Sequence, residues 1–110
     1  MEAKRRAKLE IRARIIKAMA HPTRLFIIEE LAGEEQCVHE LTEKIGVDIS
    51  TVSKHLAILK DVGIVEGDKR GPQIYYRLRM PCVSRFLGCV ETMMRSAAKR
   101  QLALLEQDRG

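Results

Sequence analysis

The sequence predicts a mainly α-helical domain that carries one small β-hairpin. Three observations lead to this fold class: apolar residues recur at helical spacing over most of the chain, Gly and Pro fall between the periodic segments, and two short strand-like segments flank a Gly-containing turn. The chain has 110 residues, 45% of them hydrophobic, which is enough to bury a core. We therefore expect a single domain over residues 1–110.

Two helices are expected first. Residues 3–19 contain no Gly or Pro and place apolar side chains at helical spacing among basic residues. The sequence His21-Pro22-Thr23 then breaks the pattern and puts Pro22 in the first turn of a second helix, which should end near Gly33.

Two further helices are predicted at 37–45 and at about 49–61, joined through Gly46 and Val47. The first is short and amphipathic, and Asp48 can cap the second by accepting hydrogen bonds from its unpaired amide groups. Residues 37–62 thus have helix-turn-helix form. The outer face of the second helix carries short polar donors beside a cation, which suit base edges and phosphates in a major groove: Ser50, Thr51, Ser53, Lys54 and His55.

A β-hairpin is expected over residues 63–79. Ile64–Glu66 and Gln73–Leu78 are strand-like, and residues 67–72 between them should form a turn with Lys69 and Arg70 at its tip. A hairpin directly after a helix-turn-helix is a wing, so the fold class becomes a winged helix-turn-helix with about five helices.

The last predicted helix covers residues 81–106 and has an apolar stripe. A chain this small has little left to cover the stripe, so we expect a homodimer formed through residues 1–20 and 81–106. Packing within one monomer is the alternative. The stripe consists of Val83, Phe86, Leu87, Val90, Met93, Met94 and Ala97.

The charge balance favours a polyanionic partner. Lys and Arg number 20 against 15 Asp and Glu, so the net charge is +5. Only 4% of the residues are aromatic, and the stacking platforms of single-strand and RNA binders are therefore scarce. Duplex DNA is the preferred partner and an anionic membrane surface the second. Because no run of about 18 apolar residues occurs, we expect a cytoplasmic protein without a membrane partner.

The order of these elements, with the motifs AMAHPTRLFIIEEL, CVHEL, STVSKHLAILKDVGIV and YYRL, resembles the ArsR/SmtB family of metal-sensing repressors over about residues 10–95. The resemblance implies a symmetric dimer that binds an operator and leaves it when an inducer binds. It also implies DNA contacts by Ser50, Ser53 and Lys54, with Thr51 and His55 as weaker candidates and Lys69 and Arg70 in the wing. For His55, a place on the helix surface or in the core is the alternative.

Three cysteines are candidate ligands for an inducer: Cys37, Cys82 and Cys89. Their odd number and wide spread favour reduced thiols over a disulfide framework, and each also fits a small buried hydrophobic residue. Cys37-Val38-His39 resembles the family's thiolate box with its second cysteine replaced by His39, which can equally be a plain surface residue.

The last helix also resembles a ligand-bearing element of the family. In other family members it hosts a zinc site of Asp, His and Glu, but this chain has Met80, Cys82 and Met93 there, which favours softer ions. Cys82 and Cys89 share a face but differ in height by about 10.5 Å, so one straight helix cannot bring both to one ion. Cys37 of the same chain or the partner's last helix must take part.

Two inducer chemistries follow. The first is As(III), Sb(III) or another soft metal ion bound by Cys37, Cys82 and Cys89, with no obligatory cofactor. The second is thiol oxidation or persulfide formation, because Cys37 and Cys82 lie near helix N-termini, where the helix dipole favours the reactive thiolate.

An enzyme is not expected, because the histidines are scattered and no phosphate loop or catalytic pair stands out. A structural adaptor built on the same fold is a further alternative, but the cationic wing tip and the Ser, Thr and Lys face argue against it.

Overall fold

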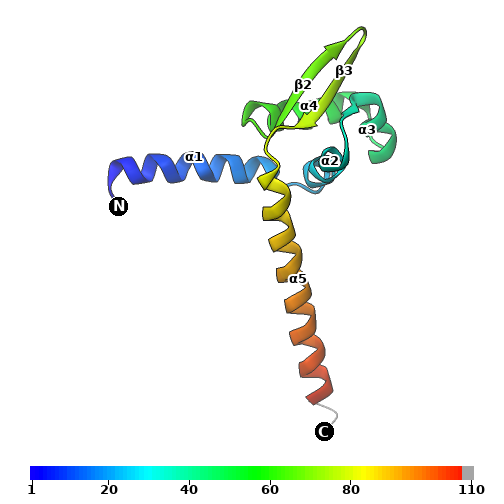
Figure 1. Ribbon diagram of the computed structural model, residues 1–110. Helices are drawn as coiled ribbons and strands as arrows, with labels where there is room; N and C mark the ends of the chain where they lie inside the picture. Colours follow the sequence, from blue (N-terminus) through cyan, green and yellow to red (C-terminus); the bar gives the residue numbers. More distant parts are fainter. Residues whose placement is uncertain (108–110) are drawn as a thin grey trace. The chain divides into compact units, whose positions relative to one another are not determined.

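The computed structural model describes residues 1–107, which form five helices and three strands in two compact units. One unit comprises Met1–Met80 and the other begins at Pro81 (Figure 1). Residues 108–110, the end of the predicted single domain, lie outside the described residues. Each unit is described by itself.

The first unit opens with helices α1 (Ala3–Met19) and α2 (Pro22–Gly33), and both have the predicted bounds. The break between them is set by His21, whose Nδ1 accepts a hydrogen bond from the Thr23 amide at 3.1 Å. Pro22 follows at the first helical position, where its missing N–H would have had no partner in the helix.

Helices α3 (Val38–Ile45) and α4 (Ile49–Asp61) form the predicted helix-turn-helix. Gly46 ends α3 in the left-handed conformation with φ 82°, and its amide donates to the Thr42 carbonyl at 2.9 Å. Asp48 caps α4, as the sequence predicts, by accepting from the Thr51 amide at 3.1 Å.

The three strands form one antiparallel sheet in the order β1-β3-β2: β1 (Gln36–Cys37), β2 (Val65–Arg70) and β3 (Gln73–Leu78). Strand β1 was not predicted. It pairs Cys37 with Tyr75, so α3 begins at Val38, one residue later than expected.

The prediction that residues 67–72 form a turn is wrong. Strand β2 continues through Lys69 and Arg70, and the turn consists of Gly71 and Pro72 alone. A two-residue hairpin turn needs a positive φ, which Gly71 supplies at 62°. Gly67 lies within this strand, and its lack of a side chain leaves room for the Tyr76 ring, whose Cε1 lies 3.1 Å from the place of a Cβ.

The core of the first unit lies between the inner faces of α2, α3 and α4 and the start of β2. Helix α1 joins it only through its C-terminal end, where Ala18 and Met19 are buried. Burial of one large apolar side chain stabilises a fold by about 1.5–3 kcal/mol, so this core holds α4 in place. The fully buried side chains are Ile27, Ile28, Gln36, Leu41, Val52, Leu56, Leu59, Ile64 and Val65.

The second unit contains α5 (Cys82–Gln107), which matches the predicted helix within one residue. None of its described residues is buried, and its apolar stripe includes Phe86 at 46%, Val90 at 39% and Met94 at 61% exposed. Among residues 1–107, no helix combines the length and the apolarity needed to cross a bilayer.

Candidate nucleic-acid interface and the three thiols

The outer face of α4 presents most of the predicted DNA-contacting side chains to solvent. Ser50, Ser53 and Lys54 are exposed, whereas Thr51 and His55 are half-buried. No ion pair involves Lys54 among the described residues, so its charge is available to an anionic partner. The buried inner face of the same helix fixes the direction in which these groups point.

Asp48 binds two hydroxyl groups at the start of α4 in addition to the cap. Ser50 Oγ donates to Asp48 Oδ2 at 2.5 Å, and Thr51 Oγ1 donates to Asp48 Oδ1 at 2.6 Å. These hydrogen bonds hold the pKa of the Asp48 carboxyl well below its usual range. Because an ionised carboxylate only accepts, both hydroxyl protons point at Asp48 and the oxygens keep lone pairs for another donor. In a major groove, such donors are the amino groups of adenine and cytosine.

His55 connects α4 to α2. Its Nδ1 accepts a hydrogen bond from Arg24 Nε at 3.0 Å, and Arg24 Nη1 in turn donates to the Ala18 carbonyl at 3.2 Å. The His21 ring lies 4.5 Å from the His55 ring between centroids. Burial lowers the pKa of His55, and the neighbouring His21 and Arg24 lower it further. The geometry therefore fits the structural alternative for His55, and a base contact by this residue stays a prediction.

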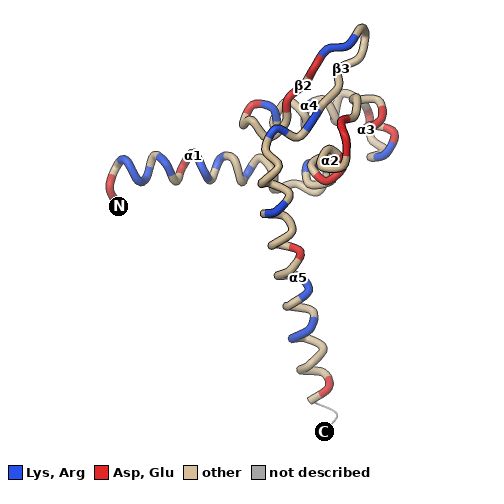
Figure 2. Tube along the Cα trace, in the orientation of Figure 1, with Lys and Arg blue, Asp and Glu red and all other residues tan. Residues whose placement is uncertain are grey.

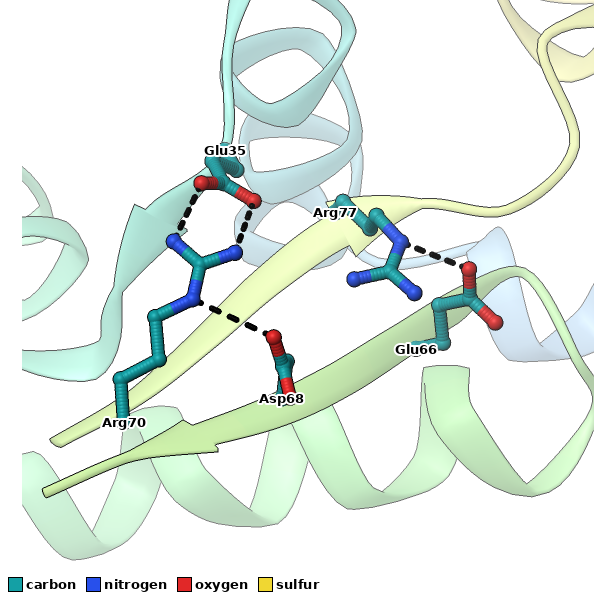
Figure 3. Close-up of polar contacts among 5 residues, drawn as sticks. All are labelled: Glu35, Glu66, Asp68, Arg70 and Arg77. Atoms are coloured by element: carbon teal, nitrogen blue, oxygen red, sulfur yellow. Dashed lines mark hydrogen bonds and ion pairs between the residues drawn. The ribbon is translucent and has the colours of Figure 1, made fainter.

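Arg70 is held by acidic side chains at the outer part of the wing. Its Nη1 and Nη2 donate to Glu35 Oε1 and Oε2 at 2.5 and 3.1 Å, and its Nε donates to Asp68 at 3.2 Å (Figure 3). The guanidinium carbon lies 4.9 Å from the centroid of the Tyr75 ring. The bond from Arg70 lowers the pKa of Glu35, while Glu35 and then Asp68 raise the pKa of Arg70.

Lys69 differs from Arg70 although the two are neighbours in the sequence. Both are exposed, but no ion pair involves Lys69 among residues 1–107. Figure 2 shows acidic and basic residues following one another along β2 as it approaches the turn. Of the two neighbouring cations near the end of β2, Arg70 is therefore compensated within the described chain and Lys69 is not.

Sequence reasoning missed the acidic residues of the wing and one further pair. Arg77 Nε donates to Glu66 Oε1 at 2.7 Å across β2 and β3, where the two residues face each other (Figure 3). A turn placed at Gly71 and Pro72 would have given this register from the sequence. Glu35 precedes β1, and the sequence contains no signal that brings it to the wing.

The three cysteines are free, and they differ in environment. Cys37 is buried, and its amide donates to Glu40 Oε1 at 3.2 Å, whereas Cys82 and Cys89 are exposed on α5. The Cys37 hydrogen bond lowers the pKa of Glu40. His39 is exposed. Within each unit of the described chain, no three His, Cys, Asp or Glu side chains are grouped to hold a metal ion.

Comparison with known proteins identifies relatives of this arrangement. The model of the bacterial regulatory protein arsR family matches residues 21–67, which include all of α2, α3 and α4. The biofilm growth-associated repressor of Xylella fastidiosa is 32% identical over 88 residues, 80% of this chain and 77% of that protein. The HTH-type transcriptional repressor SmtB of Mycobacterium tuberculosis is 39% identical over 70 residues, 64% of this chain. The match spans about half of that repressor, 52% of its length.

A solved structure extends the likeness to the fold. It is the homodimeric winged helix-turn-helix DNA-binding domain of a possible ArsR-family transcriptional regulator from Mycobacterium bovis. The TM-score is 0.79 at 30% sequence identity, and the match covers 91% of this chain and 93% of that domain. The winged helix-turn-helix predicted from the sequence is thereby confirmed.

Proposed function

The chain belongs to the ArsR family of bacterial regulatory proteins, and from this membership we propose that it is a transcriptional repressor that binds double-stranded operator DNA. The observation that carries the proposal is the two-sided character of α4, whose inner face is fully buried and whose outer face presents serine hydroxyls and the ammonium group of Lys54 to solvent. The net charge of +5 supports a polyanionic partner. The compared relatives are named as regulators and repressors, which supports a regulatory rather than an enzymatic role.

In the proposed complex, α4 lies in the major groove with its N-terminal residues against base edges. Ser50 and Thr51 would accept from bases, Ser53 would accept or donate, and Lys54 would neutralise a phosphate. The wing would approach the neighbouring backbone with Lys69. The groups that touch bases are short, so sequence preference would come from a few closely placed hydrogen bonds.

The repressor would act as a homodimer. No described residue of α5 is buried, and a second copy is the occupant that fits its apolar stripe. The related domain from Mycobacterium bovis is named as homodimeric, which supports this choice. A symmetric dimer would set two copies of α4 at a fixed spacing, which matches a two-fold symmetric operator.

The inducer would be a thiophilic ion, As(III), Sb(III) or another soft metal, bound by cysteines. Cys82 and Cys89 are exposed, and their separation along one helix requires a further ligand, either Cys37 or the last helix of a second copy. Thiol oxidation or persulfide formation is the second candidate. The observation that favours it is Cys82, an exposed thiol at the first residue of α5, which an oxidant or persulfide donor can reach directly.

The test of DNA binding is a titration of the DNA upstream of its own gene with the parent protein, Lys54→Ala and Lys99→Ala. Lys99 is the matched control, because it is also an exposed cation but lies on α5. We expect Lys54→Ala to weaken binding and to reduce the slope of log affinity against log salt by about one unit, with Lys99→Ala close to the parent. Equal loss in both variants would mean charge attraction without the proposed surface.

The test of the inducer uses Cys37→Ser, Cys82→Ser and Cys89→Ser, each titrated as the DNA complex with arsenite, antimonite, Cd(II) and a persulfide donor. We expect arsenite to release the parent and to fail with the Cys82 and Cys89 variants. Normal release of those two variants by arsenite would refute the metalloid site. Release of the parent by the persulfide donor alone would establish the thiol switch instead.

A further inference from the structure

We propose that Arg70 positions the wing and does not bind the DNA backbone, so that Lys69 is the cation through which the wing contacts phosphate. This inference rests on the proposed function and deepens it, because it assigns different roles to two adjacent cations that the sequence analysis placed together as DNA contacts. It also assigns a role to Glu35 and Asp68, two acidic residues on a surface that otherwise attracts a polyanion.

The guanidinium of Arg70 is paired with two carboxylates and stacked over an aromatic ring. Glu35 accepts from both Nη atoms in a bidentate pair, and Asp68 accepts from Nε (Figure 3). The guanidinium carbon lies over the Tyr75 ring, 4.9 Å from its centroid. Planar pairing of this kind fixes the orientation of a guanidinium as well as attracting it. To reach a phosphate, Arg70 would have to exchange these anions for another anion, with little gain.

Lys69 can contact a phosphate without giving up an ion pair within the described chain. Successive side chains of a strand point to opposite faces, so Lys69 points away from the face on which Arg70 and Asp68 meet. It lies two residues before the turn at Gly71, pairs in register with Ile74, and is exposed, as Arg70 also is. An ammonium group on a flexible stem at this position can follow a phosphate without breaking any ion pair of the described chain.

The pairing of the strands explains why the wing needs such a tie. Strand β1 pairs with β3 only at Tyr75 and Tyr76, whereas the hairpin extends beyond them to the facing residues Arg70 and Gln73. An isolated two-stranded hairpin is marginally stable. Glu35 belongs to the segment between α2 and β1, so its pair with Arg70 ties the outer part of the hairpin to the rest of the first unit.

The two possible roles of Arg70 predict opposite results for Glu35→Gln. If Arg70 were a phosphate contact restrained by Glu35, Glu35→Gln would release it and strengthen DNA binding. If Arg70 positions the wing, Glu35→Gln and Arg70→Gln should each weaken binding by a similar factor, roughly three- to ten-fold, and the double variant should be no weaker than either. Arg70→Lys separates charge from geometry, because it keeps the charge and loses the bidentate pair.

The experiment measures operator affinity and its salt slope for Glu35→Gln, Arg70→Gln, the double variant, Arg70→Lys and Lys69→Gln. We expect only Lys69→Gln to lower the slope, by about one unit, and Arg70→Lys to bind as weakly as Arg70→Gln. Stronger binding of Glu35→Gln, a lowered slope in Arg70→Gln, or parent-like binding of Arg70→Lys would overturn the proposal.

A second measurement keeps the inference separate from the proposed function. Amide hydrogen exchange of the free protein should accelerate in β2 and β3 to the same extent in Glu35→Gln and Arg70→Gln and remain unchanged in α4. Unchanged exchange in the strands would refute the positioning role whatever the DNA result. If the parent bound no duplex, the proposed repressor function would fail, and exchange would still decide whether Arg70 holds the wing.

Discussion

Helices α4 and α5 show the same apolar periodicity but differ in the burial of their apolar side chains. Val52, Leu56 and Leu59 of α4 are fully buried, whereas no described residue of α5 is buried. The spacing of apolar residues therefore predicts that each segment is a helix, but it does not say what covers the apolar face. In α4 the cover comes from the same chain, and for α5 we propose a second copy.

The largest loss of stability is expected for a substitution on the fully buried face of α4. Leu56→Ala should lower the free energy of unfolding by about 2–5 kcal/mol, because it leaves a cavity among fully buried side chains. Denaturant unfolding at one fixed protein concentration measures it. Ile58→Ala on the same helix is the control, since Ile58 is 37% exposed and should lose roughly 1 kcal/mol or less. Equal losses at the two positions would contradict the burial of the inner face.

An intermediate effect is expected on association through α5. Replacing both Phe86 and Val90 by Ala should raise the dimer dissociation constant by roughly thirty-fold, the equivalent of about 2 kcal/mol of lost apolar contact. Sedimentation equilibrium over a range of protein concentrations measures this, with Lys99→Ala as the control on the same helix. A parent protein that stays monomeric at micromolar concentration would contradict the proposal that a second copy covers the apolar face of α5.

The smallest effect concerns the polar attachment of α4. His55 has a pKa lowered from 6.5, so the unfolded chain binds a proton at this residue before the folded chain does. Its contribution to stability should be constant above about pH 6.5 and should decline as the pH falls below that value. As the pH is lowered from 8 to 5, the free energy of unfolding should therefore fall less steeply in His55→Gln than in the parent protein. The control, His39→Gln at an exposed position, should show the same pH dependence as the parent.

The sequence was sufficient for most of the fold because Gly and Pro mark its boundaries. Pro22, Gly33, Gly46 and Asp48 lie at or next to helix ends, and each acts through its own backbone or the nearest amide groups. Strand β1 escaped prediction because two residues carry no periodic signal. Gly67 was misleading, since the space that it leaves is used by the Tyr76 ring and not by a turn.

The candidate site was predictable in its residue types and less so in its contacts. The exposure of Ser53 and Lys54 follows from the helical period that buries Val52 and Leu56. The bond between Arg24 and His55 and the pair of Arg70 with Glu35 join residues 31 and 35 positions apart. Such contacts depend on how separate elements pack, and no local pattern predicts them.

The burial of Cys37 gives the three thiols different reaction rates. Cys37 is 6% exposed and its backbone pairs with Tyr75, so a reagent reaches its sulfur only while this edge of the sheet is transiently open. Its modification rate should level off at the opening rate as the reagent concentration rises, whereas the rate at exposed Cys82 should keep increasing in proportion. A brief pulse of a thiol reagent would then mark α5 alone, and only sustained exposure would mark the residue that precedes α3.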